Sequence, residues 1–202
     1  MLKWGIDIEK ICIIPLGVNR DKFYPLSNKL TNFYKKKYNL AQKKFIIGSF
    51  QKDGVGWGQG NTPKLIKGPD ILCEILKRIS QKYHIHVLLT GPSRGYVINF
   101  LRENNISFSH YYPKQYQEMN IFYNMLDLYL ITSREEGGPL SIAESLACGI
   151  PLITSNVGMA EDFIIENENG YIVEVGDIES YYKKFSHIYN LNKTNLKNFK
   201  NK

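Results

Sequence analysis

The feature that most constrains the fold of this chain is a regular alternation between short apolar runs and longer amphipathic segments. Runs such as 85–89 are rich in Ile, Val and Leu and have the length of a strand buried on both faces. Segments such as 68–82 repeat their apolar residues at helical spacing. Because parallel strands need a long crossover that is usually a helix, this alternation predicts an α/β fold with a doubly wound parallel sheet.

The elements can be placed along the chain from the same pattern. Strands are expected at 11–14, 44–50, 85–89, 106–110, 128–131, 151–155 and 171–174, and helices at 29–38, 68–82, 97–104, 114–125, 140–147, 160–166 and 178–189. About six parallel strands then form one sheet. Such sheets bind ligands in the crevice at the carboxyl ends of their strands, so functional side chains are expected in the loops that follow the strands.

Composition narrows the class of protein. The chain has 202 residues, of which 43% are hydrophobic, which is enough for one well-buried domain but short for two. No apolar run has the length of a membrane span, and residues 1–7 lack the apolar core of a secretory leader. Cys12, Cys73 and Cys148 fit reduced thiols, so a cytoplasmic location is expected. The four histidines lack metal-ligand spacing, so no metal site is expected.

The net charge of +7 favours acidic partners such as phosphorylated ligands, an anionic membrane face or nucleic acid. Some of the charge lies in the lysine run 35–37 and in a tail with Lys193, Lys197, Lys200 and Lys202. The plain alternative is that these lysines form solvated faces. Nucleic acid is not an expected partner, because the charge lacks interleaved aromatic residues or a known motif. Peripheral membrane contact stays open.

The most informative segment for chemistry is 136–144, which follows an apolar strand and leads into a helix. Backbone amides at a helix N-terminus form an anion site, and glycines let a diphosphate come close to them. Glu136 and Glu144 would then present acceptor carboxylates to the hydroxyl groups of a ribose and a sugar on either end of that diphosphate. The alternative is that Glu136 caps the helix and that Glu144 is a surface residue.

The segment resembles a known family, the retaining GT-B glycosyltransferases of the glycosyltransferase family 4 type. Their motif is E-G-x-x-L-x-x-x-E-A-x-A-x-G-x-P, and residues 136–151 are EGGPLSIAESLACGIP. The resemblance implies that Glu136 contacts the donor sugar near the reacting centre and that Glu144 accepts hydrogen bonds from the ribose. The amides of Gly137, Gly138 and Leu140 would contact the donor phosphates.

Further motifs extend the resemblance over nearly the whole chain. Residues 14–25 are similar to the family's entry into its C-terminal domain, and residues 65–70 are similar to K-G-x-D, whose lysine holds donor phosphates and is Lys67 here. Without that context, Lys67 would be a solvent lysine before a helix. The implied architecture is the Rossmann-like C-terminal half of a GT-B fold. It consists of a linker from the missing N-terminal domain (1–13), a nucleotide-sugar-binding domain (14–191) and a basic tail (192–202).

Three departures from the family pattern affect single residues. Gly48 is followed by serine where the family commonly has arginine, so Lys52 is assigned the second phosphate contact, with a solvated loop lysine as the alternative. Pro139 removes one amide from the phosphate loop. The glycine-rich loop 53–60 is longer than is usual in the family. It is either a mobile lid or a tolerated insertion.

The nucleobase is expected against the loop after 106–110, with Tyr111 or Tyr112 as stacking partner. Packing is the alternative role for both tyrosines. Arg94 is expected in a solvated turn, with a position facing the crevice as the alternative. The implied function is transfer of a sugar from a UDP- or GDP-sugar with retention, with no obligatory metal or cofactor. The chain would need the missing acceptor-binding domain for activity. The alternatives are a non-catalytic sugar-nucleotide-binding module, or a phosphorylase or epimerase of similar build.

Overall fold

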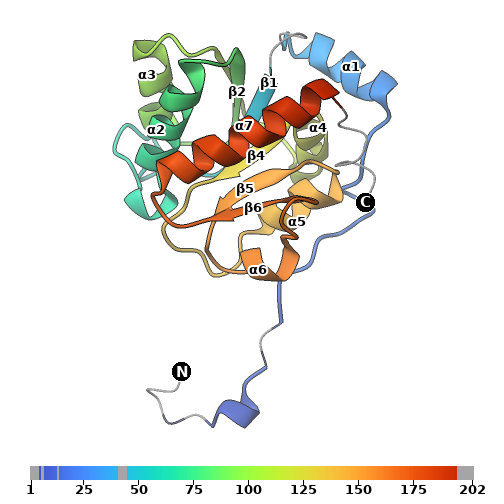
Figure 1. The fold of residues 1–202 in the computed structure, drawn as a ribbon, viewed down its shortest axis with the longest axis vertical. Coiled ribbons are helices and arrows are strands. Elements are labelled where there is room, and N and C mark those ends of the chain that lie inside the picture. The colour runs from blue at the N-terminus through green and yellow to red at the C-terminus, as the bar shows by residue number, and fades with distance from the viewer. Residues whose placement is uncertain (1–4, 6, 13, 41–44, 195–202) are drawn as a thin grey trace.

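The computed structural model describes residues 5, 7–12, 14–40 and 45–194 of the chain (Figure 1). The strands are β1 (Phe45–Ser49), β2 (Ile85–Thr90), β3 (Phe108–Tyr111), β4 (Leu128–Ile131), β5 (Leu152–Ser155) and β6 (Gly170–Val173). The α-helices are α1 (Asn28–Lys37), α2 (Pro69–Ser80), α3 (Gly95–Glu103), α4 (Met119–Asn124), α5 (Leu140–Ala147), α6 (Ala160–Phe163) and α7 (Ile178–Thr194). Short 3₁₀ turns are η2 (Ile8–Lys10), η3 (Leu65–Lys67) and η4 (Tyr116–Glu118).

The strands of the described part form one six-stranded sheet in the order β3-β2-β1-β4-β5-β6, and every adjacent pair is parallel. The chain builds β1, β2 and β3 in one direction and then returns to the other side of β1 to build β4, β5 and β6. The strand order therefore reverses between β1 and β4, which opens a crevice at their carboxyl ends. The doubly wound parallel sheet expected from the sequence is confirmed.

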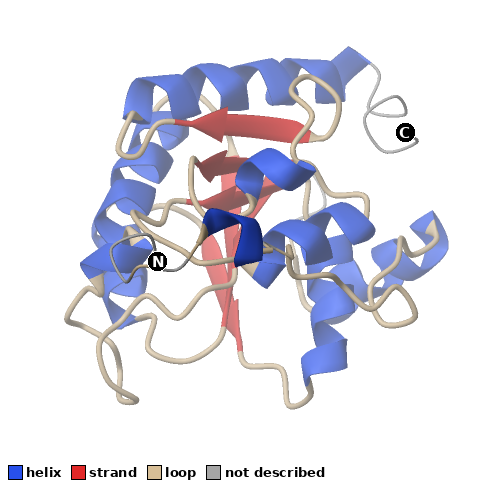
Figure 2. Ribbon diagram, turned by 90° about the horizontal axis from the view of Figure 1, so that it is seen from below, coloured by secondary structure: helices blue, strands red, loops and turns tan. Residues whose placement is uncertain are grey.

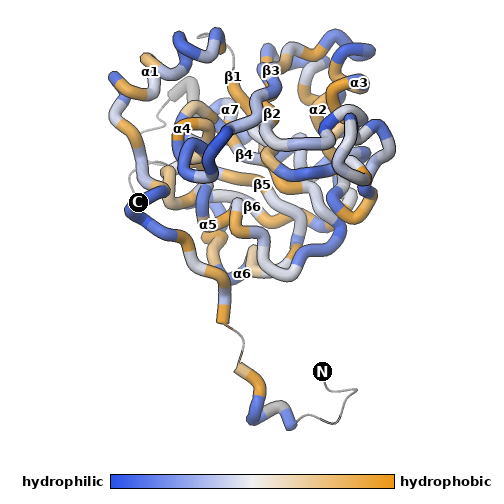
Figure 3. The backbone as a smooth tube through the Cα atoms, turned by 180° about the vertical axis from the view of Figure 1, so that it is seen from behind, coloured by the Kyte–Doolittle hydropathy of each residue, from blue (hydrophilic) through white to orange (hydrophobic). Residues whose placement is uncertain are grey.

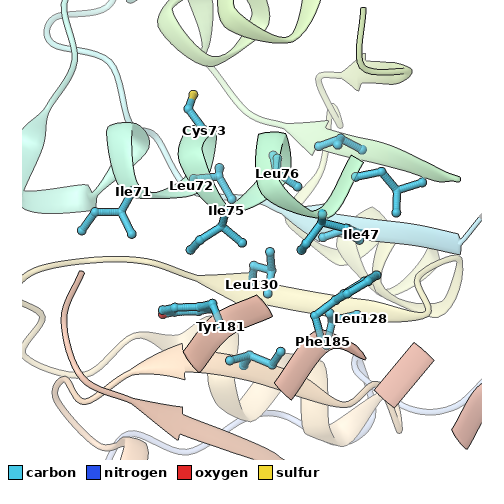
Figure 4. Close-up of a cluster of buried hydrophobic side chains, with 14 of the residues drawn as sticks. Ile47, Ile71, Leu72, Cys73, Ile75, Leu76, Leu128, Leu130, Tyr181 and Phe185 are labelled. Atoms are coloured by element: carbon cyan, nitrogen blue, oxygen red, sulfur yellow. The ribbon is translucent and has the colours of Figure 1, made fainter. Parts of the chain in front are cut away.

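Helices cover both faces of the sheet, as Figure 2 shows with the strands between two groups of helices. Successive strand residues point to opposite faces, so Ile46 and Ile47 belong to two different clusters of buried side chains. On one face, Ile47 packs with Ile75 of α2 and Phe185 of α7 (Figure 4). On the other face, Ile46 packs with side chains such as Phe122 of α4. Burial on both faces explains why β1, β2, β4 and β5 are mostly apolar, whereas the edge strand β3 is only partly buried and contains Ser109 and His110.

Most expected elements are present with ends shifted by a few residues, but the strand expected at 11–14 is wrong. Its described residues Ile11, Cys12 and Ile14 form no strand, and Ile14 is 81% exposed. This segment leads away from the sheet in Figure 1, so it has no neighbouring strand to pair with. Lys44 and residues 195–202 of the expected tail lie outside the described part of the chain, whereas 192–194 continue α7.

Candidate functional site

Lys67 and Glu136 are in contact, although one lies in η3 before α2 and the other in the loop after β4. Lys67 Nζ lies 2.5 Å from Glu136 Oε1, and the Ser133 hydroxyl donates to the same oxygen at 2.8 Å. The Gln51 amide donates to the Lys67 carbonyl at 2.7 Å and accepts from the Ser133 hydroxyl at 3.2 Å. Glu136 therefore does not cap α5, because its partners lie on neighbouring loops. The structure brings together two of the residues that the sequence selected.

Gly68 fixes the position of Lys67. It adopts φ +62°, and a Cβ at this position would lie 1.8 Å from the Thr132 carbonyl oxygen. The Thr132 hydroxyl donates to the Gly68 carbonyl at 2.9 Å, and the Arg134 amide donates to the Ile66 carbonyl at 2.9 Å. Only glycine allows both the left-handed backbone and this close approach. The glycine of the motif thus joins the start of α2 to the end of β4.

Glu144 is buried inside α5, with 5% of its surface exposed. The alternative of a surface residue is therefore wrong. The Tyr123 hydroxyl donates to Glu144 Oε2 at 2.7 Å, and the Tyr116 hydroxyl donates to Oε1. Burial raises the pKa of Glu144 to about 7, since a charged carboxylate loses its water. The two donated hydrogen bonds favour the ionised form and oppose that rise.

A pocket of about 290 Å³ opens beside Glu144 at the carboxyl ends of β1, β2 and β3. It is lined by Phe50, Thr90, Gly91, Pro92, Tyr112, Pro113, Gln115, Tyr116, Met119, Tyr123, Ser141 and Glu144. Tyr112 is among these residues and is 65% exposed. Tyr111 is not, because its ring packs on Tyr38 at 5.0 Å between centroids and its hydroxyl donates to the Tyr38 carbonyl at 2.5 Å. The two tyrosines proposed for the base thus have different surroundings.

The loop 137–140, whose amides are expected to contact phosphates, lies between the two glutamates in the sequence. Gly137 and Leu140 are exposed, and α5 begins at Leu140. Gly138 lies beside the segment that leads into the domain, since a Cβ on it would be 3.3 Å from the Leu16 side chain. The loop therefore connects Glu136 directly to the helix that carries Glu144.

Lys52 follows β1, and its ammonium group lies 3.6 Å from the ring centroid of Trp57 in the glycine-rich loop. Trp57 is 83% exposed. The distance is that of a cation–π contact, so Lys52 packs on the Trp57 ring and is not a free solvent lysine. Its assignment to a phosphate stays a prediction.

The expectation that Arg94 lies in a solvated turn is wrong. Its side chain is fully buried, and its Nε lies 3.0 Å from Asp53 Oδ1, which is also fully buried. The guanidinium donates to the Ser49 carbonyl at 2.6 Å and to the Thr90 carbonyl at 3.0 Å. Arg94 thus joins the ends of β1 and β2 to the first residue of the loop 53–60. Nothing in the local sequence signals this, because the partners are far apart along the chain.

Four residues of the site were not expected from the sequence, namely Gln51, Tyr116, Tyr123 and Ser133. The spacing of seven between Tyr116 and Tyr123 would place them on one face of a continuous helix. The expected helix 114–125 is instead a 3₁₀ turn followed by α4. Among the described residues, no group of three or more His, Cys, Asp and Glu side chains has the geometry to hold a metal ion. No helix in the described part is long and apolar enough to cross a membrane.

Comparisons with known proteins show the family and the fold class of the chain. Residues 62–202 match the model of the family "Glycosyl transferases group 1". The O-antigen biosynthesis glycosyltransferase WclY of Escherichia coli is 30% identical over 189 residues, which is 90% of this chain and 48% of WclY. A UDP-Gal:alpha-D-GlcNAc-diphosphoundecaprenol alpha-1,3-galactosyltransferase of Escherichia coli is 28% identical over 196 residues, 87% of this chain and 44% of that enzyme.

Among solved structures, Anabaena Alr3699/HepE in complex with UDP and glucose has a TM-score of 0.74 at 18% identity. The similarity covers 98% of this chain and 52% of that one, and at this identity it shows the shared fold. The chain spans about half the length of the curated relatives it matches. Its fold is that of one half of a GT-B glycosyltransferase.

Proposed function

This chain belongs to the family of glycosyl transferases group 1, and from that membership we propose that its crevice holds the sugar-nucleotide donor of a retaining glycosyl transfer. The 2.5 Å contact between Lys67 and Glu136 carries the proposal. In a sugar nucleotide the diphosphate and the sugar are joined directly, so a cation for the former and a carboxylate for the latter must be neighbours. Without donor the two side chains neutralise each other, and with donor each turns to its own part of the ligand.

The pocket beside Glu144 suits the nucleoside. Its volume of about 290 Å³ and its aromatic lining fit a ribose and base. Glu144 would accept hydrogen bonds from the ribose in place of the Tyr116 hydroxyl, and Tyr112 would stack on the base. Tyr111 is a packing residue in this proposal, because its ring and hydroxyl are both engaged by Tyr38. The amides of Gly137, Gly138 and Leu140 then face the diphosphate between the two glutamates.

In the reaction, the bond between the sugar and the diphosphate breaks, and negative charge develops on the leaving phosphate oxygen. Lys67 and the amides at the start of α5 stabilise that charge, with Lys52 as a second cation once it leaves the Trp57 ring. Glu136 orients the sugar and screens the positive charge that develops on its ring. No metal ion or other cofactor is part of this proposal, since the chain's own cations and amides serve the diphosphate.

The ligands and substrates named for two similar proteins suggest which donor and which acceptor this chain uses. HepE was solved with UDP and glucose, and one curated relative is named as a UDP-Gal-dependent galactosyltransferase acting on a diphosphoundecaprenol-linked sugar. We therefore propose a UDP-hexose donor and a lipid-linked saccharide acceptor in surface polysaccharide synthesis on the cytoplasmic side. The acceptor would be bound by a second domain that closes on this one.

The donor site can be tested by titration calorimetry with UDP and with uridine. Lys67→Ala should weaken UDP binding by about 1–3 kcal/mol, since a hydrogen bond between charged groups is lost, and leave uridine binding unchanged. Glu144→Ala should weaken both ligands, because both carry the ribose. Lys64→Ala is the matched control, as it removes an equal charge from an exposed position three residues earlier. Equal losses for UDP and uridine in Lys67→Ala, or an equal effect of Lys64→Ala, would contradict the assignment.

A further inference from the structure

The net positive charge of this chain can be assigned to one segment. Residues 22–52 contain eight lysines and no aspartate, glutamate or arginine, which gives the segment a net charge of +8. The whole chain carries +7, so the other residues together carry −1. A basic surface made of scattered solvated lysines would not show this distribution. Four of these lysines, Lys29 and Lys35 to Lys37, belong to α1.

Helix α1 contains no buried residue, and two of its large apolar side chains are exposed. Leu30 is 46% exposed and Phe33 is 58% exposed. At about 100° per residue, Leu30 and Phe33 fall within an arc of roughly 120° that also holds Lys29, Lys36 and Lys37. Figure 3 shows α1 at the edge of the molecule, with hydrophilic and hydrophobic residues intermixed along it. One outward face therefore presents apolar groups surrounded by ammonium groups.

The chemistry of this face selects its partner. Transfer of exposed Leu and Phe side chains out of water lowers the free energy. Lysines on the same face have flexible side chains that can reach neighbouring anionic groups. The boundary between lipid headgroups and acyl chains offers both environments at the depth of one helix face. A purely anionic partner such as nucleic acid would pair with the lysines but would leave no role for Leu30 and Phe33. We propose that the outward face of α1 docks this protein on an anionic lipid surface.

The inner side of α1 connects this face to the pocket. Tyr38, which ends the helix, accepts a hydrogen bond from the Tyr111 hydroxyl and packs on Phe122 of α4 at 5.1 Å between ring centroids. The next residue, Tyr112, lines the pocket beside Glu144. Docking through α1 would therefore hold the pocket at a fixed orientation to the lipid surface. The inference rests on charge and exposure and does not depend on which ligand the pocket takes.

Vesicle co-sedimentation of the full 202-residue chain tests the proposal. Vesicles of phosphatidylcholine alone are compared with vesicles that contain about one-third phosphatidylglycerol. We expect binding to the anionic vesicles, with affinity falling steeply as salt is raised. Replacing Lys29, Lys36 and Lys37 by glutamine should weaken binding by about fivefold per lysine. The double variant Leu30→Ser/Phe33→Ser keeps the charge and should also weaken binding, because the inserted apolar area is lost.

The matched control removes the same number of charges from exposed positions outside α1. It combines Lys77→Gln in α2, Lys82→Gln in the turn after α2 and Lys183→Gln in α7. This variant should bind within about twofold of the parent chain. Thermal unfolding confirms that each variant is folded. The proposal is overturned if the control loses as much affinity as the α1 variant, or if the chain binds neutral and anionic vesicles equally. It is equally overturned if the serine variant binds the anionic vesicles as tightly as the parent chain. Binding would then be purely electrostatic, without insertion of Leu30 and Phe33.

Discussion

Glu144 shows how one side chain combines two conflicting demands. Its position on the second turn of α5 buries it against Tyr123, and burial alone favours a protonated carboxyl. A ribose, however, is held best by an ionised acceptor, since a charged hydrogen bond is about twice as strong as a neutral one. The hydroxyls of Tyr116 and Tyr123 reconcile the two by donating to both carboxylate oxygens in the free site. Burial raises the pKa of Glu144 to about 7, so its charge depends on pH near neutrality.

This balance predicts a pH dependence of donor binding. With a pKa of about 7, Glu144 is mostly ionised at pH 8 and mostly protonated at pH 6. The affinity for UDP should then fall by about tenfold over this range, because binding selects the ionised form. Calorimetry at both pH values measures the change. The phosphates of UDP titrate too, so Glu144→Gln is the control and reports that part alone. If the affinity of the parent chain for UDP changes with pH no more than that of the variant, then Glu144 does not change its protonation state over this range.

The loop 53–60 is an element whose shape is set at its two ends. Asp53 is paired with the buried Arg94, and Gly60 lies so close to Ser93 that a Cβ there would be 2.3 Å from its carbonyl. The Ser93 hydroxyl donates to the carbonyls of Gly56 and Gly58 at 3.0 and 3.1 Å. Of the two interpretations of this insertion, the contacts favour an ordered loop that holds Trp57 over Lys52. Its glycines serve close backbone approach at both ends.

Breaking the pair under this loop should destabilise the whole domain. Arg94→Met leaves Asp53 buried without its partner, and the expected loss is about 3–5 kcal/mol in the free energy of unfolding. Combining it with Asp53→Leu removes the orphaned charge and should recover part of that loss. Arg102→Met, at the exposed end of α3, is the control and should change stability by less than about 0.5 kcal/mol. Urea denaturation measures all four proteins. A loss below about 1 kcal/mol in Arg94→Met would mean that water reaches Asp53.

On the scale of the whole molecule, large apolar side chains are exposed in the segment before α1 and in the connection between β1 and α2. Trp57 is 83% exposed, Leu65 and Val55 are each 54% exposed, and Leu16 is 50% exposed. Exposed apolar groups gathered around a site mark a binding surface. The chain spans about half the length of its curated relatives, and the second domain suggested under the proposed function is the partner that we propose for this surface. Its closure would exclude water from the reacting bond.

We accordingly predict that the 202-residue chain binds a sugar nucleotide but does not transfer the sugar. The reason is that alignment of the acceptor and exclusion of water both require the closed cleft. Purified chain is incubated with radiolabelled UDP-hexose and candidate acceptors, and released sugar is compared with spontaneous hydrolysis. Glu136→Ala serves as the background control. Turnover above that background, with a defined acceptor and no added protein, would refute the half-enzyme interpretation.

The sequence by itself determined the order of the elements and the residue types of the loop 136–144. The alternation of apolar strands and amphipathic helices specified the sheet, because β1, β2, β4 and β5 are buried on both faces. The spacing between Glu136 and Glu144 could be recognised because both residues belong to one short segment of chain. The physical reason for Gly68 lies in the fold, since its backbone approaches the carbonyl of Thr132, 64 residues away. The strand expected at 11–14 failed because an apolar run becomes a strand only where a neighbour offers hydrogen bonds.

Only the tertiary structure decided how charges and aromatic rings combine. The contact of Lys67 with Glu136 joins residues 69 positions apart, and that of Arg94 with Ser49 joins residues 45 apart. The burial of Glu144 and the separation of Tyr111 from Tyr112 also depend on which helix covers which strand end. Such contacts arise between segments that meet only after the sheet has formed. Local patterns therefore carry the fold and the residue types of the site, whereas the partners and protonation of those residues follow from the packing.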